Sequence, residues 1–392
     1  MRLRLVPKET KIDFFGRWKL WLGISGMAMV IAFASFLLQG LNYGIDFRGG
    51  TTIRTESTQA IDIGAYRGAI AELGLGDVSI TEVFDPSFGP EKNVAMVRIQ
   101  AQDGQESVSA ELIETVEAAL GALVGGRMSF AVTGVNATTD QLAAALADLP
   151  VTPEIAAEGG TAQIAFPADT PAGERLAAHE ALTRLGVDGV DVSYDSFKII
   201  SVESVGPKVS GELIQTAVIA VTLAIGAVLV YIWLRFEWQF ALGAVVALIH
   251  DVLLTIGIFS ELQIRFDLAI IAALLTIVGY SLNDTVIVFD RVRENLRKYK
   301  QMPLAEVLNL SINETLSRTT MTSFTTLLAL ISLYVLGGDV IRGFVFAMIW
   351  GVVVGTYSSI FVASTILLWL GVKRDWSKPD ANAGTQFANV DA

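Results

Sequence analysis

The sequence contains no cysteine and only two histidines among its 392 residues. Without cysteine a disulfide framework is excluded, and two histidines supply too few ligands for a Cys/His metal site. Only 17% of the residues are charged, and no part of the chain carries a long basic face interleaved with aromatic side chains. We therefore expect neither a metal site nor a nucleic acid partner.

Apolar residues are abundant instead, because 52% of the chain is hydrophobic. This composition indicates a membrane protein. The net charge of -12 is unevenly distributed: residues 42–211 hold 24 acidic and 10 basic side chains, a balance of -14. The rest of the chain therefore carries a balance of about +2.

A helix of about 20 mostly apolar residues crosses the hydrocarbon core of a bilayer. Six stretches qualify, at residues 20–41, 213–234, 239–259, 267–289, 317–336 and 342–370. The first has too long an apolar core for a signal peptide, so we expect an uncleaved anchor. The remaining divisions are an N-terminal segment 1–19, the acidic segment 42–211, a helical bundle 212–371 with a loop at 290–316, and a tail 372–392.

The Lys and Arg residues of the short loops predict the orientation, because they concentrate on the cytoplasmic side. With the N-terminus inside, the inner segments hold fifteen and the outer loops hold two, Arg265 and Arg342. The inner set is Arg2, Arg4, Lys8, Lys11, Arg17, Lys19, Arg235, Arg291, Arg293, Arg297, Lys298, Lys300, Lys373, Arg374 and Lys378. Both termini are therefore expected to be cytoplasmic, with residues 42–211 exported.

The exported segment alternates strand and helix patterns. Residues 51–56 and 93–99 alternate apolar and polar side chains, whereas 62–75 and 109–123 have apolar residues at helical spacing. This order predicts an α+β domain with the split βαβ arrangement of a ferredoxin-like fold.

The strand and helix alternation then starts again, over residues of about 126–196. We interpret this as a second, weaker copy of the unit, in which residues 190–202 form one closing strand. The alternative is one enlarged domain with an inserted hairpin and helix. His179 lies on the expected helix 171–186 without another histidine nearby, which favours a surface or core role over metal binding.

GIDFRGG, residues 44–50, joins the first span to the exported domain. Gly49 and Gly50 permit backbone conformations that residues with a Cβ resist, so a tight turn is expected after Gly44, Asp46 and Phe47. The segment lacks the GxGxxG or GK[ST] spacing of phosphate-binding loops.

Charged side chains inside the spans are the candidate functional residues, because each costs about 2.5 to 3.5 kcal/mol at the centre of a span. Asp284 follows Asn283 in the fourth span. Arg318 enters the fifth span, since the apolar stretch 321–336 alone is about 24 Å long and too short to cross. The similar depths of Asp284 and Arg318 suggest an ion pair. It is either a proton relay that breaks and reforms, or a static pair holding two helices together.

His250 and Asp251 lie in the middle of the third span. Neighbouring helical residues point about 100° apart, so we do not expect the two side chains to pair with each other. Asp251 is either a second relay residue or a hydrogen-bonded structural carboxyl. GVVVG at 351–355 predicts a helix packing face. Residues 290–295 predict an amphipathic extension of the fourth helix, in which arginines neutralise Asp290 and Glu294.

Several motifs together resemble the protein translocase subunit SecF family. They are GIDFRGG, VESVGP before the second span, RFEWQFALGAVVALIHDV, GYSLNDTVIVFDRVREN and NETLSRTTMTS. The resemblance implies a multi-pass protein of the bacterial inner membrane with residues 42–211 in the periplasm. It also implies that Asp284 matches the family's membrane carboxylate and Arg318 its charged partner.

The family resemblance further implies a heterodimer with SecD in a twelve-span, RND-like assembly driven by protons. This assembly would act on unfolded exported polypeptides beside SecYEG and SecA, with YajC and YidC as further partners, and would use no cofactor. The roughly 70 additional exported residues depart from the single compact domain usual in the family. Two alternatives remain: half of an RND-type exporter of small molecules or lipids, and a scaffold in which the buried pair is structural.

Overall fold

The computed structural model describes residues 10–75, 78–83, 93–100, 110–125, 127–133, 139–158, 161–168, 170–184 and 189–372. The chain divides into two compact units, Gly44–Leu213 and the remainder, Met1–Tyr43 with Ile214–Ala392. Six of the fifteen predicted inner basic residues, Arg2, Arg4, Lys8, Lys373, Arg374 and Lys378, lie outside the described residues, as does the tail after residue 372.

Six helical stretches of the described chain are long and apolar enough to cross a membrane. They are α1 (Trp18–Gln39), α7 (Pro207–Arg235), α8 (Trp238–Glu261), α9 (Leu268–Lys298), α10 (Leu304–Leu336) and α11 (Asp339–Ser358), which continues through the π-helix η1 (Ser359–Ala363) into α12 (Ser364–Leu370). The predicted six-helix membrane fold is confirmed. The segment 290–316 is largely helical, because α9 runs on to Lys298 and α10 already begins at Leu304.

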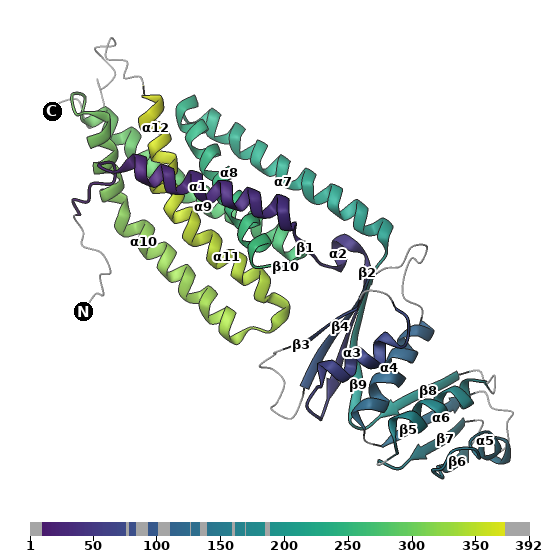
Figure 1. The fold of residues 1–392 in the computed structure, drawn as a ribbon. Coiled ribbons are helices and arrows are strands. Elements are labelled where there is room, and N and C mark those ends of the chain that lie inside the picture. The colour runs from purple at the N-terminus through teal and green to yellow at the C-terminus, as the bar shows by residue number, and fades with distance from the viewer. Residues whose placement is uncertain are drawn as a thin grey trace, which may run out of the picture. The chain divides into compact units, whose positions relative to one another are not determined.

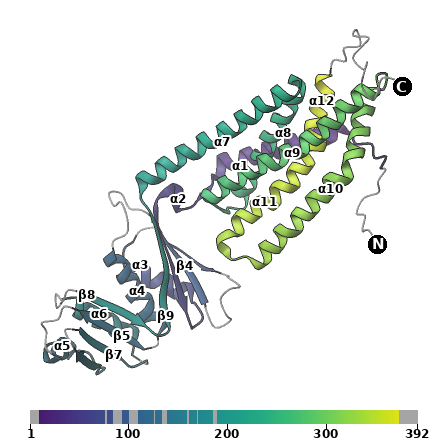
Figure 2. The same cartoon turned by 180° about the vertical axis from the view of Figure 1, so that it is seen from behind.

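The helices differ in how much of their surface they bury. The apolar parts of α8 and of α11 with its continuation are the most enclosed. Most side chains of α7 and of residues 321–336 in α10 are exposed, and both helices lie along the outside of the bundle (Figures 1 and 2). Phe240 and Phe289 pack edge to face at 5.2 Å in the bundle core. A short parallel pair of strands, β1 (Asn42–Tyr43) and β10 (Arg265–Phe266), closes one end of the bundle.

Glycines bring two pairs of these helices into close contact. A Cβ on Gly351 of α11 would lie 2.3 Å from Ile277 of α9, and one on Gly355 would lie 3.0 Å from Cβ of Ser281. The predicted packing face of GVVVG is therefore confirmed, with α9 as its neighbour. In the second pair, α8 and α1, a Cβ on Gly257 would lie 2.2 Å from Cβ of Ala32.

The unit Gly44–Leu213 contains two antiparallel sheets, each with two helices. The first has the strand order β3-β4-β2-β9 and the second β6-β7-β5-β8. The first is built from β2 (Gly50–Ser57), α3 (Ile63–Ala71), β3 (Val78–Val83), β4 (Asn93–Gln100), α4 (Ala110–Val124) and β9 (Phe197–Val205). The second is built from β5 (Met128–Thr133), α5 (Thr139–Ala145), β6 (Glu154–Glu158), β7 (Thr161–Phe166), α6 (Ala172–Arg184) and β8 (Gly189–Tyr194). Both have the order of a ferredoxin-like fold.

The second ferredoxin-like unit is inserted into the first, between α4 and β9. The expected single strand 190–202 is wrong, because β8 belongs to the second sheet and β9 pairs with β2 of the first. The chain turns between them at Asp195, whose side chain accepts a 2.6 Å hydrogen bond from the backbone nitrogen of Arg127. The two ferredoxin-like units share one apolar core, to which Leu120 of the first and Phe130 of the second contribute.

Candidate functional site

Asp284 lies on the inner face of α9. This helix begins after Asp267, whose side chain caps it by accepting a 3.3 Å hydrogen bond from the nitrogen of Ile270. Asp284 is 1% exposed, and its Oδ2 has no hydrogen-bond partner. An unpartnered carboxyl oxygen in such a place costs free energy, which marks a functional candidate rather than a stabilising contact.

The predicted ion pair between Asp284 and Arg318 is absent, since no hydrogen bond or salt bridge within 4.0 Å joins these two described side chains. Arg318 still lies near enough to act on the Asp284 carboxyl electrostatically. The reason is the rotation of α10, which buries Thr319 and Ser323 and leaves Arg318 exposed on the outer side. Asn283 is also exposed, away from the buried Asp284.

His250 and Asp251 do pair, against expectation. His250 Nδ1 lies 2.9 Å from Asp251 Oδ1, and both side chains are buried, at 0% and 1% exposure. The expectation was wrong because it considered only the directions of the Cα–Cβ bonds. Rotation about the side-chain bonds brings the imidazole and the carboxyl together along the helix surface.

Two serines from other helices complete the surroundings of Asp251. Ser281 Oγ of α9 donates to Asp251 Oδ2 at 2.6 Å, and Ser358 Oγ of α11 donates to the same oxygen at 2.8 Å. Neither serine was singled out from the sequence, although hydroxyl residues within apolar spans are the signal that could have found them. Asp251 thus joins three helices, and Ser281 lies one turn before Asp284.

The GIDFRGG segment forms the short helix α2 (Ile45–Arg48), which contains Asp46 and the buried Phe47. Gly49 has φ 74° and Gly50 has φ 136°, so both adopt conformations that strain residues with a Cβ. The predicted turn is confirmed at these two glycines, whereas Gly44 has an ordinary φ of -71°. These residues belong to the compact unit Gly44–Leu213, and Asp284 belongs to the other.

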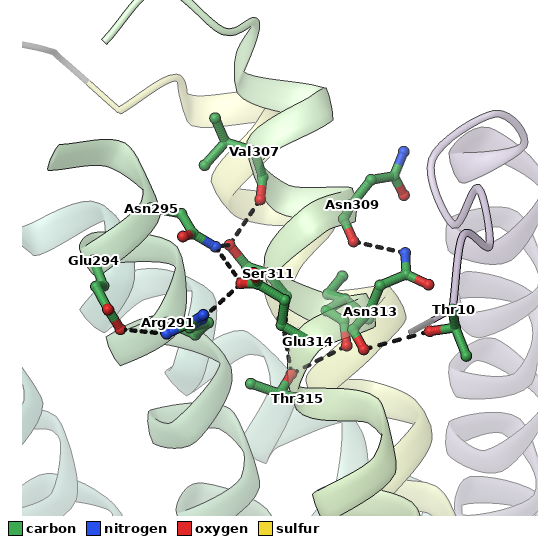
Figure 3. A network of polar contacts seen from close by, with 11 residues as sticks. Thr10, Arg291, Glu294, Asn295, Val307, Asn309, Ser311, Asn313, Glu314 and Thr315 are labelled. Carbon is green, nitrogen blue, oxygen red and sulfur yellow. Dashed lines mark hydrogen bonds and ion pairs between the residues drawn. The ribbon is translucent and has the colours of Figure 1, made fainter. Parts of the chain in front are cut away.

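Beyond the apolar part of the bundle, α9 and α10 are joined by the polar network of Figure 3. Arg291 donates to Glu294 at 2.7 Å and to Glu314 at 2.6 Å, so the predicted neutralisation of Glu294 is confirmed. Asn295, 1% exposed, donates to Glu314 at 2.7 Å and to Ser311 at 3.0 Å. Asp290 pairs separately with Arg235 at 3.5 Å.

The N-terminal segment is attached to α10 by two asparagines one turn apart. The side-chain amide of Asn313 accepts from the nitrogen of Ile12 and donates to its carbonyl, both at 2.9 Å (Figure 3 shows Asn313 beside Thr10). Asn309 accepts from the nitrogen of Phe14 at 2.8 Å. Phe14 then packs edge to face on Phe361 of the π-helix, with ring centroids 5.9 Å apart. The segment therefore connects α10 to η1.

Two family models match the chain. Residues 34–61 match the SecD/SecF GG motif, and residues 189–373 match the C-terminal region of the protein export membrane proteins SecD/SecF. The first match contains Gly49 and Gly50, and the second contains Asp251, Asp284 and Arg318.

Curated relatives match over nearly the full length. The protein translocase subunit SecF of Cereibacter sphaeroides is 52% identical over 391 residues, covering 100% of this chain and 99% of the relative. That of Rickettsia felis is 34% identical, covering 93% of this chain and 94% of the relative.

A solved structure also matches, the crystal structure of SecDF, a translocon-associated membrane protein from Thermus thermophilus. It is 29% identical with a TM-score of 0.66, and the match covers 94% of this chain and 40% of that chain. The present chain thus spans well under half of the SecDF chain. Because the curated relatives match at up to 52% identity over the whole sequence, the chain belongs to the SecF family of protein translocase subunits.

Proposed function

We propose that this chain is the SecF half of a SecDF accessory complex that uses the proton motive force to promote late steps of protein export across the bacterial inner membrane. The observation that carries the proposal is Asp284, a carboxyl 1% exposed whose Oδ2 has no hydrogen-bond partner. Intramembrane carboxyls of this kind are typical of proton relays.

The proposed mechanism depends on two ways of lowering the free-energy cost of the unpartnered Asp284 carboxylate. A proton removes its charge, and closer approach of the Arg318 guanidinium compensates the charge. The structure has Arg318 near Asp284 without contact, which leaves room for α9 and α10 to change their packing. A potential of about 100 mV supplies about 2.3 kcal/mol for each charge that crosses the membrane.

We propose that this change of packing moves the exported unit, which binds and releases the emerging polypeptide. GIDFRGG serves as the joint, supported by the positive φ values of Gly49 and Gly50. Asp251 and His250 hold α8, α9 and α11 together beside the relay. Protons are the only coupling species required, so no cofactor takes part.

The partner in this proposal is a SecD chain that covers the exposed sides of α7 and α10. Arg318 is exposed on α10 at a depth where lipid is a poor neighbour for a guanidinium, so a protein surface beside it is expected. SecYEG with SecA, and YajC and YidC, are proposed as further partners, and unfolded exported polypeptides as the substrate. Residues 42–211 are proposed to be periplasmic and both termini cytoplasmic.

The experiment compares Asp284→Asn with Asp290→Asn in membranes that contain the SecD partner. Both changes remove a carboxylate from α9, but Asp290 is half exposed and is bound only at the surface by Arg235. We expect Asp284→Asn to reduce the export rate and the proton conductance at least about tenfold, which corresponds to about 1.4 kcal/mol. Asp290→Asn should leave both near the unaltered values.

Unchanged export and conductance in Asp284→Asn would overturn the proton-coupled mechanism. Normal export in Asp284→Asn combined with Arg318→Gln, at equal protein level, would instead favour a scaffold. Retained export together with increased drug sensitivity of a depletion strain would favour an exporter of small molecules.

A further inference from the structure

A second group of buried titratable side chains lies in the bundle, and the Asp284 relay does not require it for proton transfer. Asp251 accepts hydrogen bonds on both oxygens, from Ser281 and Ser358 on Oδ2 and from His250 on Oδ1. The other ring nitrogen of His250, Nε2, is buried and has no hydrogen-bond partner. We propose that His250 and Asp251 together bind one proton, and that Ser281 couples this second site to Asp284.

Charge favours proton binding by the pair. With His250 neutral and donating from Nδ1, the pair carries one negative charge in the middle of a span, and no arginine or lysine among the described residues pairs with Asp251. A single charge at this depth is costly. A proton added to Nε2 converts the imidazole to imidazolium and brings the charge of the pair from -1 to zero. No other bond is formed or broken.

The hydrogen bonds show where the proton is accommodated. Three donors around the Asp251 carboxyl keep both oxygens occupied, so the free acceptor of the pair is Nε2 of His250. A buried acceptor without a partner is unfavourable, and either protonation or a water molecule would satisfy it. The imidazole ring stacks on the ring of Tyr357, with the two ring centroids 6.2 Å apart.

The titratable neighbours of the pair are few. Tyr357 of α11 lies against His250, but its hydroxyl is bound to Ser25 at 3.0 Å and to the carbonyl of Trp21 at 3.1 Å, both on α1. On α9, Ser281 lies against the pair, and Asp284 follows one turn later. Asp284 is thus the acid closest along α9 to the proposed site, and its charge is the one that the site should respond to.

Ser281 provides the connection to Asp284. Its hydroxyl binds Asp251, and its Cβ would lie 3.0 Å from a Cβ added at Gly355 of α11, so this turn of α9 has neighbours on two sides. Ser358 directly precedes the π-helix η1, and π-helical turns are frequent at functional sites. Protonation of the pair changes the charge that both serines bind, and thereby the packing of α9 and α11. Use of this site in export rests on the proposed function, whereas its existence does not.

The test uses the two histidines of the chain. The full-length protein with His179→Gln, labelled with ¹⁵N-histidine and reconstituted in lipid bilayers, gives imidazole signals from His250 alone. The first measurement needs no change at the site: we expect His250 to pass from neutral imidazole to imidazolium as the pH is lowered. Asp251→Asn, which preserves the volume of the side chain, should abolish this transition over the same pH range.

Coupling is tested by combining variants. Asp284→Asn should move the pH of the His250 transition, and Ser281→Ala should remove this response while the transition itself remains. A His250 signal that stays neutral at every pH, or a transition unaffected by Asp251→Asn, would overturn the proton site. An equal response to Asp284→Asn with and without Ser281 would overturn the coupling. A His250 transition in a protein whose export ignores Asp284→Asn would contradict the proposed function and leave the site standing.

Discussion

Asp284 and Asp251, which are buried, and His179, which is half-buried, are titratable residues with different surroundings. Asp251 is surrounded by hydrogen-bond donors, whereas Asp284 Oδ2 and His179 Nδ1 have no hydrogen-bond partner. Unpartnered atoms such as these make the protonation state of a residue depend on its environment. For Asp284 and Asp251 this dependence would serve the proposed relay, and for His179 it affects the stability of the unit Gly44–Leu213.

His179 should make the inserted ferredoxin-like unit sensitive to acid. Burial against Phe130 lowers the pKa of His179 below its ordinary value of 6.5, although Glu114 and Glu180 partly oppose the shift. The folded state therefore binds fewer protons than the unfolded state at acid pH. His179 therefore leaves the free energy of unfolding unreduced above pH 6.5 and reduces it as the pH falls below this value.

The measurement is amide hydrogen exchange of α6 and β5 in the full-length chain, corrected for the intrinsic effect of pH. Protection should fall from pH 7 toward acid pH more steeply in the unaltered chain than in His179→Gln. Equal pH dependence in both proteins would show that His179 does not control this stability.

At the scale of elements, glycines determine which helices and strands approach closely. Gly121 of α4 faces Tyr194 of β8, whose hydroxyl donates to the carbonyl of Ala118 at 3.2 Å. This contact joins a helix of the first ferredoxin-like unit to a strand of the second. Gly68 of α3, in contrast, has open space where a Cβ would be.

Gly121→Ala should therefore destabilise the unit Gly44–Leu213, because the new Cβ would lie 2.3 Å from the ring of Tyr194. We expect a loss of about 1 to 3 kcal/mol from overpacking. Gly68→Ala is the matched control and should stabilise by about 0.5 to 1 kcal/mol, since alanine favours the helix and meets no neighbour. Denaturant unfolding of the full-length protein measures both, and equal effects of the two changes would refute the proposed contact.

The attachment of the N-terminal segment to α10 is also testable. Asn313→Ala removes two hydrogen bonds to Ile12, each worth about 0.5 to 1.5 kcal/mol net, so the segment should detach more often. Hydrogen exchange of the Ile12 amide should accelerate. Thr10→Val, which removes only a 3.4 Å contact to the carbonyl of Asn313, should change this rate little. Persistent protection of Ile12 in Asn313→Ala would exclude this attachment.

Elements with a strong periodic pattern were predictable, and those decided by long-range pairing were not. The amphipathic α4 agrees with expectation. β4 forms where a strand was expected, but the expected half-buried alternation is wrong, because residues 94–97 are all buried. The assignment of β8 and β9 to different sheets depends on partners that lie far away in the sequence, so no local pattern reveals the break at Asp195. The edge strand β6 was not predicted, because its short sequence EIAAE has little β propensity.

At the scale of the whole molecule, the chain combines a helical membrane unit with the unit Gly44–Leu213, in which one ferredoxin-like fold is inserted into another. The insertion lies between α4 and β9, where it leaves the strand order of the first sheet unchanged. This explains how the second ferredoxin-like unit is accommodated without disturbing the first sheet.

The orientation of this molecule can be tested without a background signal, because the sequence contains no cysteine. Ala143→Cys places a thiol at an exposed position of α5, and Gln301→Cys places one between α9 and α10. A membrane-impermeant maleimide added to spheroplasts should label Ala143→Cys and leave Gln301→Cys unlabelled until the membrane is permeabilised. The reverse pattern would invert the proposed topology.

The sequence by itself determined the spans, the joining turn at Gly49 and Gly50, and the unusual acids Asp251 and Asp284, because hydrophobic length and the cost of buried charge are local properties. Only the tertiary structure decided their partners. It separated Arg318 from direct contact with Asp284, and it brought Ser281 and Ser358 to Asp251. These outcomes depend on how each helix is rotated, which is set by close packing at residues such as Gly355 rather than by the sequence of one helix.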